Sequence, residues 1–309
     1  MKVALLFPGQ GSQAVGMGRS LAETFPEAKA VFDAADAALG FKLSSICFDG
    51  PEDHLKLTEN TQPALVTTSV AALRVLESRG VMAQGVAGHS LGEYSALVAS
   101  KSLSFDDAVR AVRLRGRYMQ EAVPVGKGAM AAILMLDAAK VDEACAEAAQ
   151  GEVVAAANLN CPGQIVIAGD AAAVDRAIEA CTARGAKRAI KLSVSAPFHC
   201  ALMKPAEIRL AADLATLAFA DSAVPVYRNV DGEPQTTAIA ARDGLVRHVS
   251  LPVQWQKTLE SMSRDGFDTF IEVGAGTVVS GLVKKTLKGA RILNVEDAAS
   301  LEKTLGALR

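Results

Sequence analysis

One serine stands between two glycines in the segment "GHSLGEYSAL", which runs from Gly88 to Leu97. A short apolar stretch precedes Ser90, and a run of small residues typical of a closely packed helix follows it. The pattern G-x-S-x-G between a strand and a helix is typical of a nucleophile elbow, a strained turn that exposes the serine hydroxyl. The N–H of the next residue, Leu91, then points towards an oxyanion that forms at the serine. We therefore predict that Ser90 is a nucleophile; the alternative is a glycine-rich turn with a capping serine.

Four histidines could accept the proton of this serine, because a hydroxyl needs a neighbouring base to become nucleophilic. His54 lies in the polar stretch "PEDHLKLTEN", which is typical of solvated surface. His89 directly precedes the serine, so the turn should aim its side chain elsewhere. His199 follows a proline in an expected loop, and His248 lies near an expected helix end. Because loops carry catalytic residues more often than helix surfaces do, we favour His199 and keep His248 as the alternative.

A third catalytic residue is not evident in the sequence. A serine hydrolase of the elbow type carries an acidic residue after a core strand, between the serine and the histidine in chain order. Asp137 and Asp170 follow expected strands in that interval, but both belong to the middle region described below. The sequence therefore predicts a serine–histidine dyad. A hydrolase that passes its acyl group to water remains the first rival activity.

Arg115 falls within the apolar stripe of the helical segment 106–121, whereas Arg110, Arg113 and Arg117 share the opposite face. A guanidinium that points inward carries a large desolvation cost unless it meets an anion. That anion is either a carboxylate of the protein, in an internal salt bridge, or a carboxylate of a substrate, held by two charge-assisted hydrogen bonds. Beside an acylatable serine, the second arrangement would select a dicarboxylic acyl group.

A glycine-containing loop, "FPGQGSQAVG", follows the first expected strand. Gly9, Gly11 and Ala14 formally match the dinucleotide-binding pattern G-x-G-x-x-A, but no second strand ending in an acidic residue follows at the required distance. No phosphate-binding G-x-x-x-x-G-K-[ST] motif occurs either. We therefore expect the loop to bring the N–H of Gln10 towards Ser90 as a second oxyanion donor, with nucleotide binding as the rival function.

Apolar runs with strand periodicity alternate with helical segments, which indicates an α/β fold. Core strands are expected at residues 2–7, 83–87, 223–227, 268–273 and 290–295, and helices at residues 63–78 and 105–122. The remaining question is how the middle of the chain joins this core.

The middle region has a pattern of its own. It reads as strand 128–136, helix 137–150, strands 152–160 and 163–170, helix 171–185 and strand 186–194. This β-α-β-β-α-β order is typical of a ferredoxin-like unit. We therefore predict a ferredoxin-like subdomain over residues 124–194, inserted into a core made of residues 1–123 and 195–309.

Composition excludes several classes of partner. The formal net charge of the 309 residues is -2, which gives no indication of nucleic-acid binding. No apolar stretch is long enough to cross a membrane, and the apolar run at the N-terminus ends at Pro8, too early for a secretion signal. The 5 cysteines lie far apart without a C-x-x-C pair, which fits reduced thiols and no zinc site. We therefore expect a cytoplasmic protein without a membrane partner.

Seven motifs along nearly the whole chain resemble, in their order, the malonyl-CoA–acyl carrier protein transacylase family. They are "FPGQGSQ", "GHSLGEYSAL", "RLRGRYMQEAV", "NLNCPGQIVIAG", "SAPFHCALMKPA", "NVDG" and "EVGAGTVVSGL". The resemblance implies an α/β-hydrolase-like core with a parallel sheet and the inserted ferredoxin-like subdomain. It also implies ping-pong transfer of a malonyl group from malonyl-CoA, through a malonyl-serine, to the phosphopantetheine thiol of acyl carrier protein. We expect a monomer that needs no metal and no bound cofactor.

The resemblance assigns roles to residues that match the family's motifs. Ser90 resembles the nucleophile and His199 its base, while Arg115 resembles the clamp for the malonyl carboxylate. The backbone N–H groups of Gln10 and Leu91 resemble the oxyanion hole. The resemblance does not distinguish fatty acid synthesis from a polyketide pathway or malonate decarboxylation, since all three use this chemistry.

Further positions are implied to bind substrate. Asn158, Asn160 and Asn229 resemble polar residues that line the substrate channel. Phe198 matches a position that, in related polyketide acyltransferases, accompanies selection of malonyl over methylmalonyl groups. His248 stands where the family usually has glutamine, near the main-chain carbonyl that orients the base. That carbonyl survives the change, whereas any role of the glutamine side chain in binding substrate would pass to the imidazole.

Overall fold

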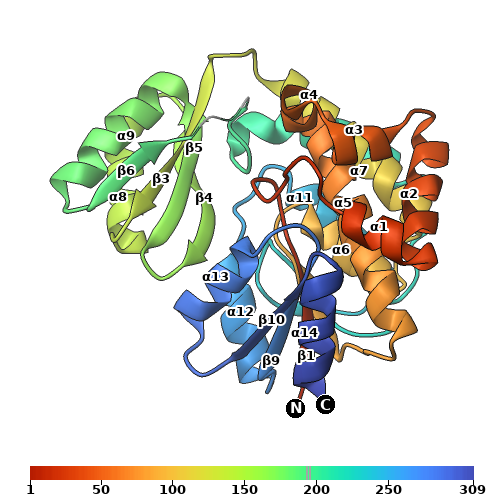
Figure 1. Cartoon of the computed structure of the whole chain (residues 1–309). Coiled ribbons are helices and arrows are strands. Elements are labelled where there is room, and N and C mark those ends of the chain that lie inside the picture. Colours follow the sequence, from red (N-terminus) through yellow and green to blue (C-terminus); the bar gives the residue numbers. More distant parts are fainter. Residues whose placement is uncertain (193, 195) are drawn as a thin grey trace.

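The computed structural model describes residues 1–192, 194 and 196–309 of the chain. Figure 1 shows two lobes, a larger one that contains both termini and a smaller one, green in the figure, made from the middle of the chain. A six-stranded sheet forms the centre of the larger lobe and a separate four-stranded sheet forms the smaller one. The structure therefore has the α/β architecture that the alternation of segments predicted.

The larger sheet has the strand order β10-β9-β1-β2-β7-β8. Its strands are β1 (Val3–Phe7), β2 (Gly85–Gly88), β7 (Val226–Tyr227), β8 (Pro234–Gln235), β9 (Thr269–Val273) and β10 (Arg291–Val295). All neighbours are parallel except β7 and β8. β1 and β2 are paired so that Phe7 lies opposite Gly88. The loops that follow these two strands therefore leave the same edge of the sheet side by side, which brings the segment around Gln10 to the serine turn.

Helices cover both faces of this sheet, which explains why its central strands are buried along their whole length. Leu5 and Phe7 belong to the apolar cluster that includes the helices α5 and α7, whereas Leu6 belongs to the cluster of α12 and α13. The helices of the larger lobe are α1 (Arg19–Thr24), α2 (Pro26–Leu39), α3 (Leu43–Asp49), α4 (Glu52–Lys56), α5 (Thr58–Ser78), α6 (Gly92–Ala99), α7 (Phe105–Ala122), α10 (Lys204–Leu214), α11 (Ala238–Arg247), α12 (Trp255–Arg264), α13 (Val278–Thr286) and α14 (Ala298–Leu308), with a short 3-10 helix at Ala201–Met203. Within the described residues, none of the helices combines the length and apolar character needed to cross a membrane.

Helix α5 begins at Thr58, five residues before the expected start at Pro63. We expected the helix to begin at Pro63 because proline usually stands in the first helical turn, where its missing N–H costs nothing. That expectation was wrong. Here Pro63 lies within the helix, so the carbonyl of Glu59 loses its helical donor. The Nη1 atom of Arg113 donates to that carbonyl instead, at 2.9 Å. A hydrogen bond between α7 and α5 therefore replaces a backbone hydrogen bond within α5.

Helix α7 spans the predicted range, Phe105–Ala122, and begins at a capping serine, Ser104, whose hydroxyl accepts the N–H of Asp107. The helix crosses α5 closely at Gly116. A Cβ atom there would lie 2.7 Å from the Cα of Glu59 and 2.7 Å from the carbonyl oxygen of Thr58. This close crossing fixes the depth at which the neighbouring Arg115 enters the protein.

The smaller lobe contains β3 (Gly128–Leu134), α8 (Ala138–Ala149), β4 (Val154–Cys161), β5 (Gln164–Asp170), α9 (Ala171–Ala183) and β6 (Arg188–Lys191). The six elements have the predicted types and order, and their strands form an antiparallel sheet in the order β4-β5-β3-β6. The lobe has an apolar core of its own between the sheet and its two helices. The last strand, predicted over residues 186–194, is shorter in the structure and spans Arg188–Lys191. Residue 193 of that predicted strand and residue 195, the predicted start of the second core segment, lie outside the described residues.

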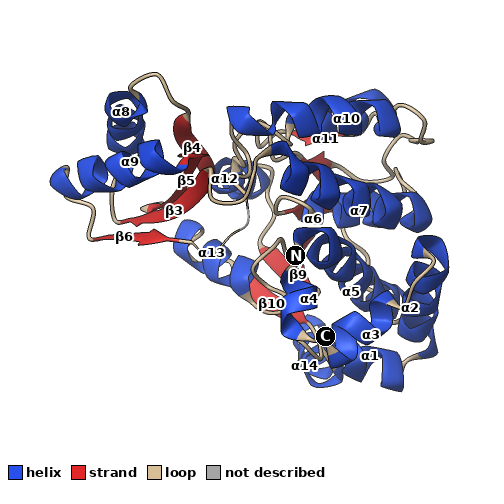
Figure 2. Ribbon diagram, turned by 90° about the horizontal axis from the view of Figure 1, so that it is seen from above, coloured by secondary structure: helices blue, strands red, loops and turns tan. Residues whose placement is uncertain are grey.

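Strand β4 joins the two lobes, as Figures 1 and 2 show where it lies beside α12 and α13. The N–H of Leu159 donates to the carbonyl of Val253 at 2.9 Å, and the N–H of Val253 donates to the carbonyl of Ala157 at 2.9 Å. This short parallel pairing, centred on Asn158 and Val253, attaches the smaller lobe to the larger one. The two asparagines of β4 are thereby held over the edge of the larger sheet from which Ser90 projects.

Candidate active site

Ser90 lies at the turn between β2 and α6, and its backbone is left-handed, with φ of 52°. The flanking glycines are required by close contacts between backbone segments. A Cβ at Gly88 would lie 1.9 Å from the carbonyl of Gly92, and one at Gly92 would lie 2.4 Å from the carbonyl oxygen of Phe7. The spacing of the glycines therefore predicted the turn because any larger residue at either position would collide with the main chain.

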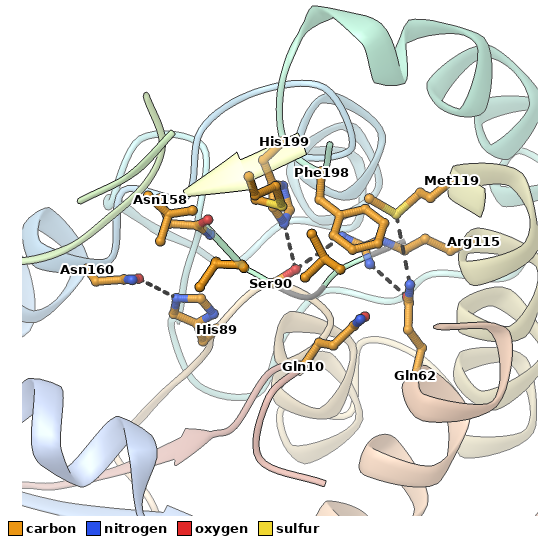
Figure 3. Close-up of a pocket in the computed structure, with 14 residues that line it drawn as sticks. Gln10, Gln62, His89, Ser90, Arg115, Met119, Asn158, Asn160, Phe198 and His199 are labelled. Carbon is orange, nitrogen blue, oxygen red and sulfur yellow. Dashed lines mark hydrogen bonds between the residues drawn. The ribbon is translucent and has the colours of Figure 1, made fainter. Parts of the chain in front are cut away.

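The structure brings Ser90 and His199 together across 109 positions of sequence (Figure 3). The Ser90 Oγ and His199 Nε2 atoms are 2.8 Å apart, and His199 Nδ1 lies 2.9 Å from the carbonyl oxygen of His248. A carbonyl can only accept a hydrogen bond, so Nδ1 must carry the ring proton. The lone pair of Nε2 then faces the serine hydroxyl, which is the arrangement a general base requires.

His248 reaches the site through its main chain, as the resemblance implied, but its side chain does not enter the pocket. The imidazole is 1% exposed and stacks on the ring of His199, with centroids 4.7 Å apart and an interplanar angle of 19°. Neither of its ring nitrogens has a hydrogen-bond partner among the described residues. The expectation that the His248 side chain binds substrate is therefore corrected, because the ring lies behind the base and not in front of it.

Arg115 is 2% exposed, so the helical pattern placed it correctly inside the protein. Its Nη1 atom donates to Gln62 Oε1 at 2.7 Å and its Nη2 atom donates to Ser90 Oγ at 3.3 Å. Its Nε atom has no hydrogen-bond partner in the part of the chain that the structure describes. None of the ion pairs formed among the described residues includes Arg115, so an internal salt bridge does not account for its burial. Burial lowers the pKa of the guanidinium.

Gln62 is a pocket residue that the sequence analysis missed. Its carbonyl oxygen holds Arg115, and its amide nitrogen donates to Thr58 Oγ1 at 3.1 Å. The hydroxyl of Thr58 donates in turn to Gln10 Oε1 at 2.8 Å. The sequence offered one signal, a set of polar residues within the buried helix α5. That pattern does not show that Gln62 would contact Arg115 of α7.

The N-terminal loop packs directly on the serine turn. A Cβ at Gly9 would lie 2.5 Å from the carbonyl oxygen of His89, so glycine is needed for this approach. In the described part of the chain, neither the N–H of Gln10 nor that of Leu91 has an acceptor. Helix α1 begins only at Arg19, so the loop glycines do not open a helix as a dinucleotide site requires. The loop geometry therefore supports an oxyanion site and not a nucleotide site.

A pocket of about 160 Å³ lies in front of Ser90, between the two lobes (Figure 3). Asn158 and Asn160 line it from β4, as the resemblance implied, and Phe198 forms part of its wall. Of the described residues that line the pocket, none is aspartate or glutamate. The guanidinium of Arg115 therefore gives the pocket a positive charge that a bound anion could neutralise.

His89 also lines the pocket, but its ring points to the smaller lobe and not to the hydroxyl of Ser90. Its Nε2 atom lies 2.8 Å from Asn160 Oδ1, and its ring packs edge-on against Trp255, with centroids 5.3 Å apart. The expectation that the turn aims this side chain away from the serine hydroxyl is therefore confirmed, since the ring bonds Asn160 of the smaller lobe. His89 connects the serine turn to that lobe.

Asn229 does not line the pocket, although the resemblance implied a substrate channel position. It is fully buried behind the turn, where its Oδ1 atom accepts the N–H of Ser90 at 3.0 Å. Its Nδ2 atom donates to the carbonyl of Gly88 at 2.7 Å. The implied position is corrected because the loop after β7 lies beneath the turn and not in the wall of the pocket.

Burial keeps the histidines of the site neutral. Burial and the charge of Arg115 lower the pKa of His199 to about 3, and burial also lowers the pKa of His89 and of His248. A neutral imidazole can accept a proton from Ser90 in the resting protein. Each of these rings would gain a proton more readily in the unfolded chain, where its pKa is near the ordinary value of about 6.5.

We therefore expect the free energy of unfolding to fall as the pH decreases from 6.5 to 5. The unfolded chain binds protons at these histidines and the folded chain does not, which contributes up to about 1.4 kcal/mol per pH unit for each ring. Glu93 acts in the opposite direction, because burial raises its folded pKa to about 7 and its protonation favours the folded chain as the pH falls. Glu272 acts in the same direction as Glu93, because burial raises its pKa as well. The three buried rings outnumber these two carboxyls, so the net change is a loss of stability.

Urea unfolding at pH 7.5, 6.5, 5.5 and 5.0 measures this dependence. His248→Gln removes one buried ring, so the number of protons that the chain takes up on unfolding should fall by about one. The free energy of unfolding should then change less steeply with pH. A free energy of unfolding that stays constant over this interval would show that the rings are protonated in the folded protein.

The chain matches known proteins over almost its whole length. The acyl transferase domain family matches residues 4–307. The malonyl CoA-acyl carrier protein transacylase of Escherichia coli (strain K12) is 52% identical over 283 residues, which are 91% of this chain and 92% of the relative. The crystal structure of an acyl carrier protein S-malonyltransferase from Vibrio cholerae superposes with a TM-score of 0.96 at 48% identity, covering 98% of this chain and 100% of that one.

A second solved structure, of a type II PKS acyl-carrier protein in complex with its malonyl-transacylase, superposes with a TM-score of 0.97 at 46% identity. It covers 99% of this chain and 100% of the matched one. The chain therefore belongs to the acyl transferase domain family, and the resemblance to malonyl-CoA–acyl carrier protein transacylases that its motifs predicted is confirmed.

Proposed function

We propose that the protein transfers the malonyl group of malonyl-CoA to the phosphopantetheine thiol of acyl carrier protein through a malonyl-Ser90 intermediate. Relatives at about half identity over most of the chain carry the corresponding name, and a solved neighbour contains a carrier protein. One observation of the site carries the proposal: a buried guanidinium, which forms no ion pair with the residues that the structure describes, lies 3.3 Å from the hydroxyl of Ser90. An acyl group that carries a free carboxylate beside its thioester carbonyl fits this arrangement, because the carboxylate can bind Arg115 while the carbonyl faces Ser90.

The first half of the reaction acylates the serine. The malonyl carboxylate binds Arg115 through two charge-assisted hydrogen bonds, which places the thioester carbonyl beside Ser90. His199 Nε2 takes the hydroxyl proton as Oγ attacks that carbonyl. The oxyanion is held by the N–H groups of Gln10 and Leu91, and in comparable sites one such donor contributes about 3 kcal/mol to transition-state stability. The C–S bond then breaks, and the CoA thiolate leaves with the proton from His199.

The second half repeats these steps in reverse. The phosphopantetheine thiol of the carrier gives its proton to His199 Nε2 and attacks the ester carbonyl of malonyl-Ser90. The oxyanion forms again at the N–H groups of Gln10 and Leu91. The C–O bond to Ser90 breaks, the serine oxygen recovers its proton from His199, and the malonyl thioester leaves on the carrier. No step draws a group from outside the two substrates and these side chains.

The charge of Arg115 also couples substrate binding to the strength of the base. In the resting site this charge is one cause of the low pKa of His199. A bound malonyl carboxylate offsets the positive charge, so the pKa of His199 should rise and the ring should become a better proton acceptor. An acetyl group has no second carboxylate and leaves the base weak. The site therefore favours malonyl transfer in the chemical step as well as in binding.

We further propose roles for the pocket wall and for the fold. Asn158 and Asn160 offer amide groups to the polar parts of the acyl thioester, and the ring of Phe198 crowds a methyl branch next to the carboxylate. The larger lobe corresponds to an α/β-hydrolase-like core of residues 1–123 and 195–309. The smaller lobe, residues 124–194, corresponds to a ferredoxin-like subdomain, which its β-α-β-β-α-β order and strand order support.

The proposed substrates also suggest where and for which pathway the protein acts. We propose that the protein acts in the cytoplasm as a monomer and supplies malonyl groups for fatty acid synthesis. Its cysteines are free and buried, which agrees with a reducing compartment. A carrier of a polyketide pathway or a malonate decarboxylase would use the same site.

Mass spectrometry of the protein after brief exposure to malonyl-CoA tests the proposed function. We expect a malonyl adduct on the peptide that contains Ser90, and its discharge when a phosphopantetheine-bearing carrier protein is added. Ser90→Ala should carry no adduct. Rapid release of free malonate without carrier would favour the rival hydrolase, and an adduct on another residue would overturn the assignment of Ser90.

A further inference from the structure

We infer that Asn229 and Glu93 act together as positioning residues that hold the backbone of the serine turn in its reactive shape. We call this pair the elbow clamp. The inference rests on the proposed role of Ser90 as the nucleophile. It assigns Asn229 a role in the catalytic step in place of contact with substrate, and it gives Glu93 a role that the motif pattern left without explanation.

The turn needs an external support because its backbone is strained. A residue other than glycine in the left-handed region costs free energy and persists only where the surrounding structure imposes it. Ser90 has φ of 52°, and no strand or helix ladder bond uses its N–H. The group that does accept this N–H therefore decides how firmly the serine is held.

One amide side chain supplies that support. Asn229 Oδ1 accepts the N–H of Ser90 at 3.0 Å, while Asn229 Nδ2 donates to the carbonyl of Gly88 at 2.7 Å. The same side chain thus bonds the chain on both sides of His89 and fixes the peptide groups that lead into Ser90. An asparagine suits this position because it offers an acceptor and a donor on one planar group.

Glu93 holds the asparagine in turn. Its Oε2 atom accepts the backbone N–H of Asn229 at 2.9 Å and also accepts from Asn229 Nδ2. Glu93 lies in the first turn of α6, three residues after Ser90, so the helix that the turn opens also carries the anchor. Ser90 is therefore bonded to Asn229, and Asn229 is bonded to Glu93, which lies in the helix α6 that directly follows the serine turn.

The clamp is buried and lies outside the pocket. Asn229 is 0% exposed and Glu93 is 1% exposed, and neither lines the cavity in front of Ser90. Several charged or titratable groups face Glu93: His248 Nδ1 lies 3.9 Å from its Oε2, and Arg228, Asp231 and Arg115 act on it at longer range. Loss of the clamp should therefore change the position of the serine and leave the affinity for substrate nearly intact.

The kinetic test compares variants that keep or remove single hydrogen bonds. Asn229→Ala removes all of the side-chain bonds, and Asn229→Asp keeps the acceptor for Ser90 but loses both donors and faces Glu93 with a second carboxylate. We expect each to lower kcat about 100-fold, since a displacement of about 1 Å at a reacting group costs that much. KM for malonyl-CoA should change less than about 3-fold, because the binding groups are untouched.

Variants of Glu93 provide the matched control. Glu93→Gln keeps an oxygen that can accept from Asn229, so its kcat should stay within about 5-fold of the parent, whereas Glu93→Ala should lose about as much as Asn229→Ala. The pair Asn229→Asp with Glu93→Gln restores a donor opposite the new carboxylate. It should therefore be faster than Asn229→Asp alone, which a merely structural role for either residue would not produce.

Amide hydrogen exchange gives a readout that is independent of activity. The N–H of Ser90 should exchange at least about 10-fold faster in Asn229→Ala, which removes its acceptor, and at nearly the parent rate in Glu93→Gln. If Asn229→Ala does not fold, Asn229→Asp and the Glu93 variants decide the question. Unchanged exchange at Ser90, together with a raised KM and a preserved kcat, would overturn the clamp and return Asn229 to the substrate channel.

The failure of the clamp and the failure of the proposed function have different signatures. Absence of a malonyl adduct on Ser90 in the parent protein would remove the proposed function and leave the exchange result standing. Normal malonylation with insensitive exchange would remove the clamp alone. Asn160→Ala should raise KM because Asn160 lines the pocket, and it therefore shows what a substrate contact looks like in the same assay.

Discussion

His199→Ala should slow the acylation of Ser90 by malonyl-CoA by roughly 10⁴-fold, the upper end of what a positioned general base contributes. The reason is geometric. His199 Nε2 lies 2.8 Å from Ser90 Oγ, and no other imidazole nitrogen hydrogen-bonds this hydroxyl among the residues that the structure describes. Stopped-flow mixing with malonyl-CoA, followed by quantification of the adduct on the Ser90 peptide, measures the rate.

His248→Ala is the matched control for this loss. It removes the second imidazole and keeps the main-chain carbonyl that accepts from His199 Nδ1 at 2.9 Å. Acylation should then fall by less than about 10-fold, because only the stacking contact that steadies the ring is lost. A loss as large as that of His199→Ala would mean that the base was assigned to the wrong histidine. Titration calorimetry with malonyl-CoA should show unchanged affinity for His199→Ala, since this ring does not hold the carboxylate.

Arg115→Ala should lower kcat/KM for malonyl-CoA by about 10³-fold. Hydrogen bonds to charged groups contribute about 1.5–3 kcal/mol each, so a two-point clamp corresponds to about 3–6 kcal/mol, or between 10² and 10⁴ in rate. Transfer from acetyl-CoA should fall by less than about 10-fold, because acetyl has no carboxylate to lose. It could even rise, since removal of the nearby positive charge allows the pKa of His199 to increase.

Arg115→Lys separates charge from shape. A lysine ammonium keeps the positive charge but offers no planar pair of donors, so malonyl transfer should recover only part of the loss. Equal losses on malonyl-CoA and acetyl-CoA would show that Arg115 supports the fold instead of the substrate. Thermal unfolding of both variants checks that comparison, because removal of a side chain that is 2% exposed also leaves a cavity beside Gln62.

Part of this site could be predicted from local patterns alone. The spacing of Gly88, Ser90 and Gly92 predicted the turn, because a Cβ at Gly88 would collide with the main chain of Gly92, four residues later. The requirement for glycine at position 92 comes from Phe7 on the neighbouring strand, which the spacing alone does not reveal. The period of the helix predicted that Arg115 points inward, and its 2% exposure confirms that. The order of strands and helices followed from hydrophobic period for the same reason, since period reports which face of an element is buried. Helix α5 shows the limit, because the donor that makes Pro63 tolerable comes from another helix.

The amino-acid sequence by itself determined the nucleophile turn, the inward arginine and the order of elements in the smaller lobe, whereas the edge strand β8 of the larger lobe was not predicted. Only the tertiary structure decided which histidine meets Ser90, that the main chain of His248 orients that histidine, and that His89 faces the pocket while Asn229 lies beneath the turn. These contacts join residues separated by 49 to 139 positions. Their geometry depends on how the sheet, its helices and the smaller lobe pack against one another, and no pattern within one segment encodes that packing.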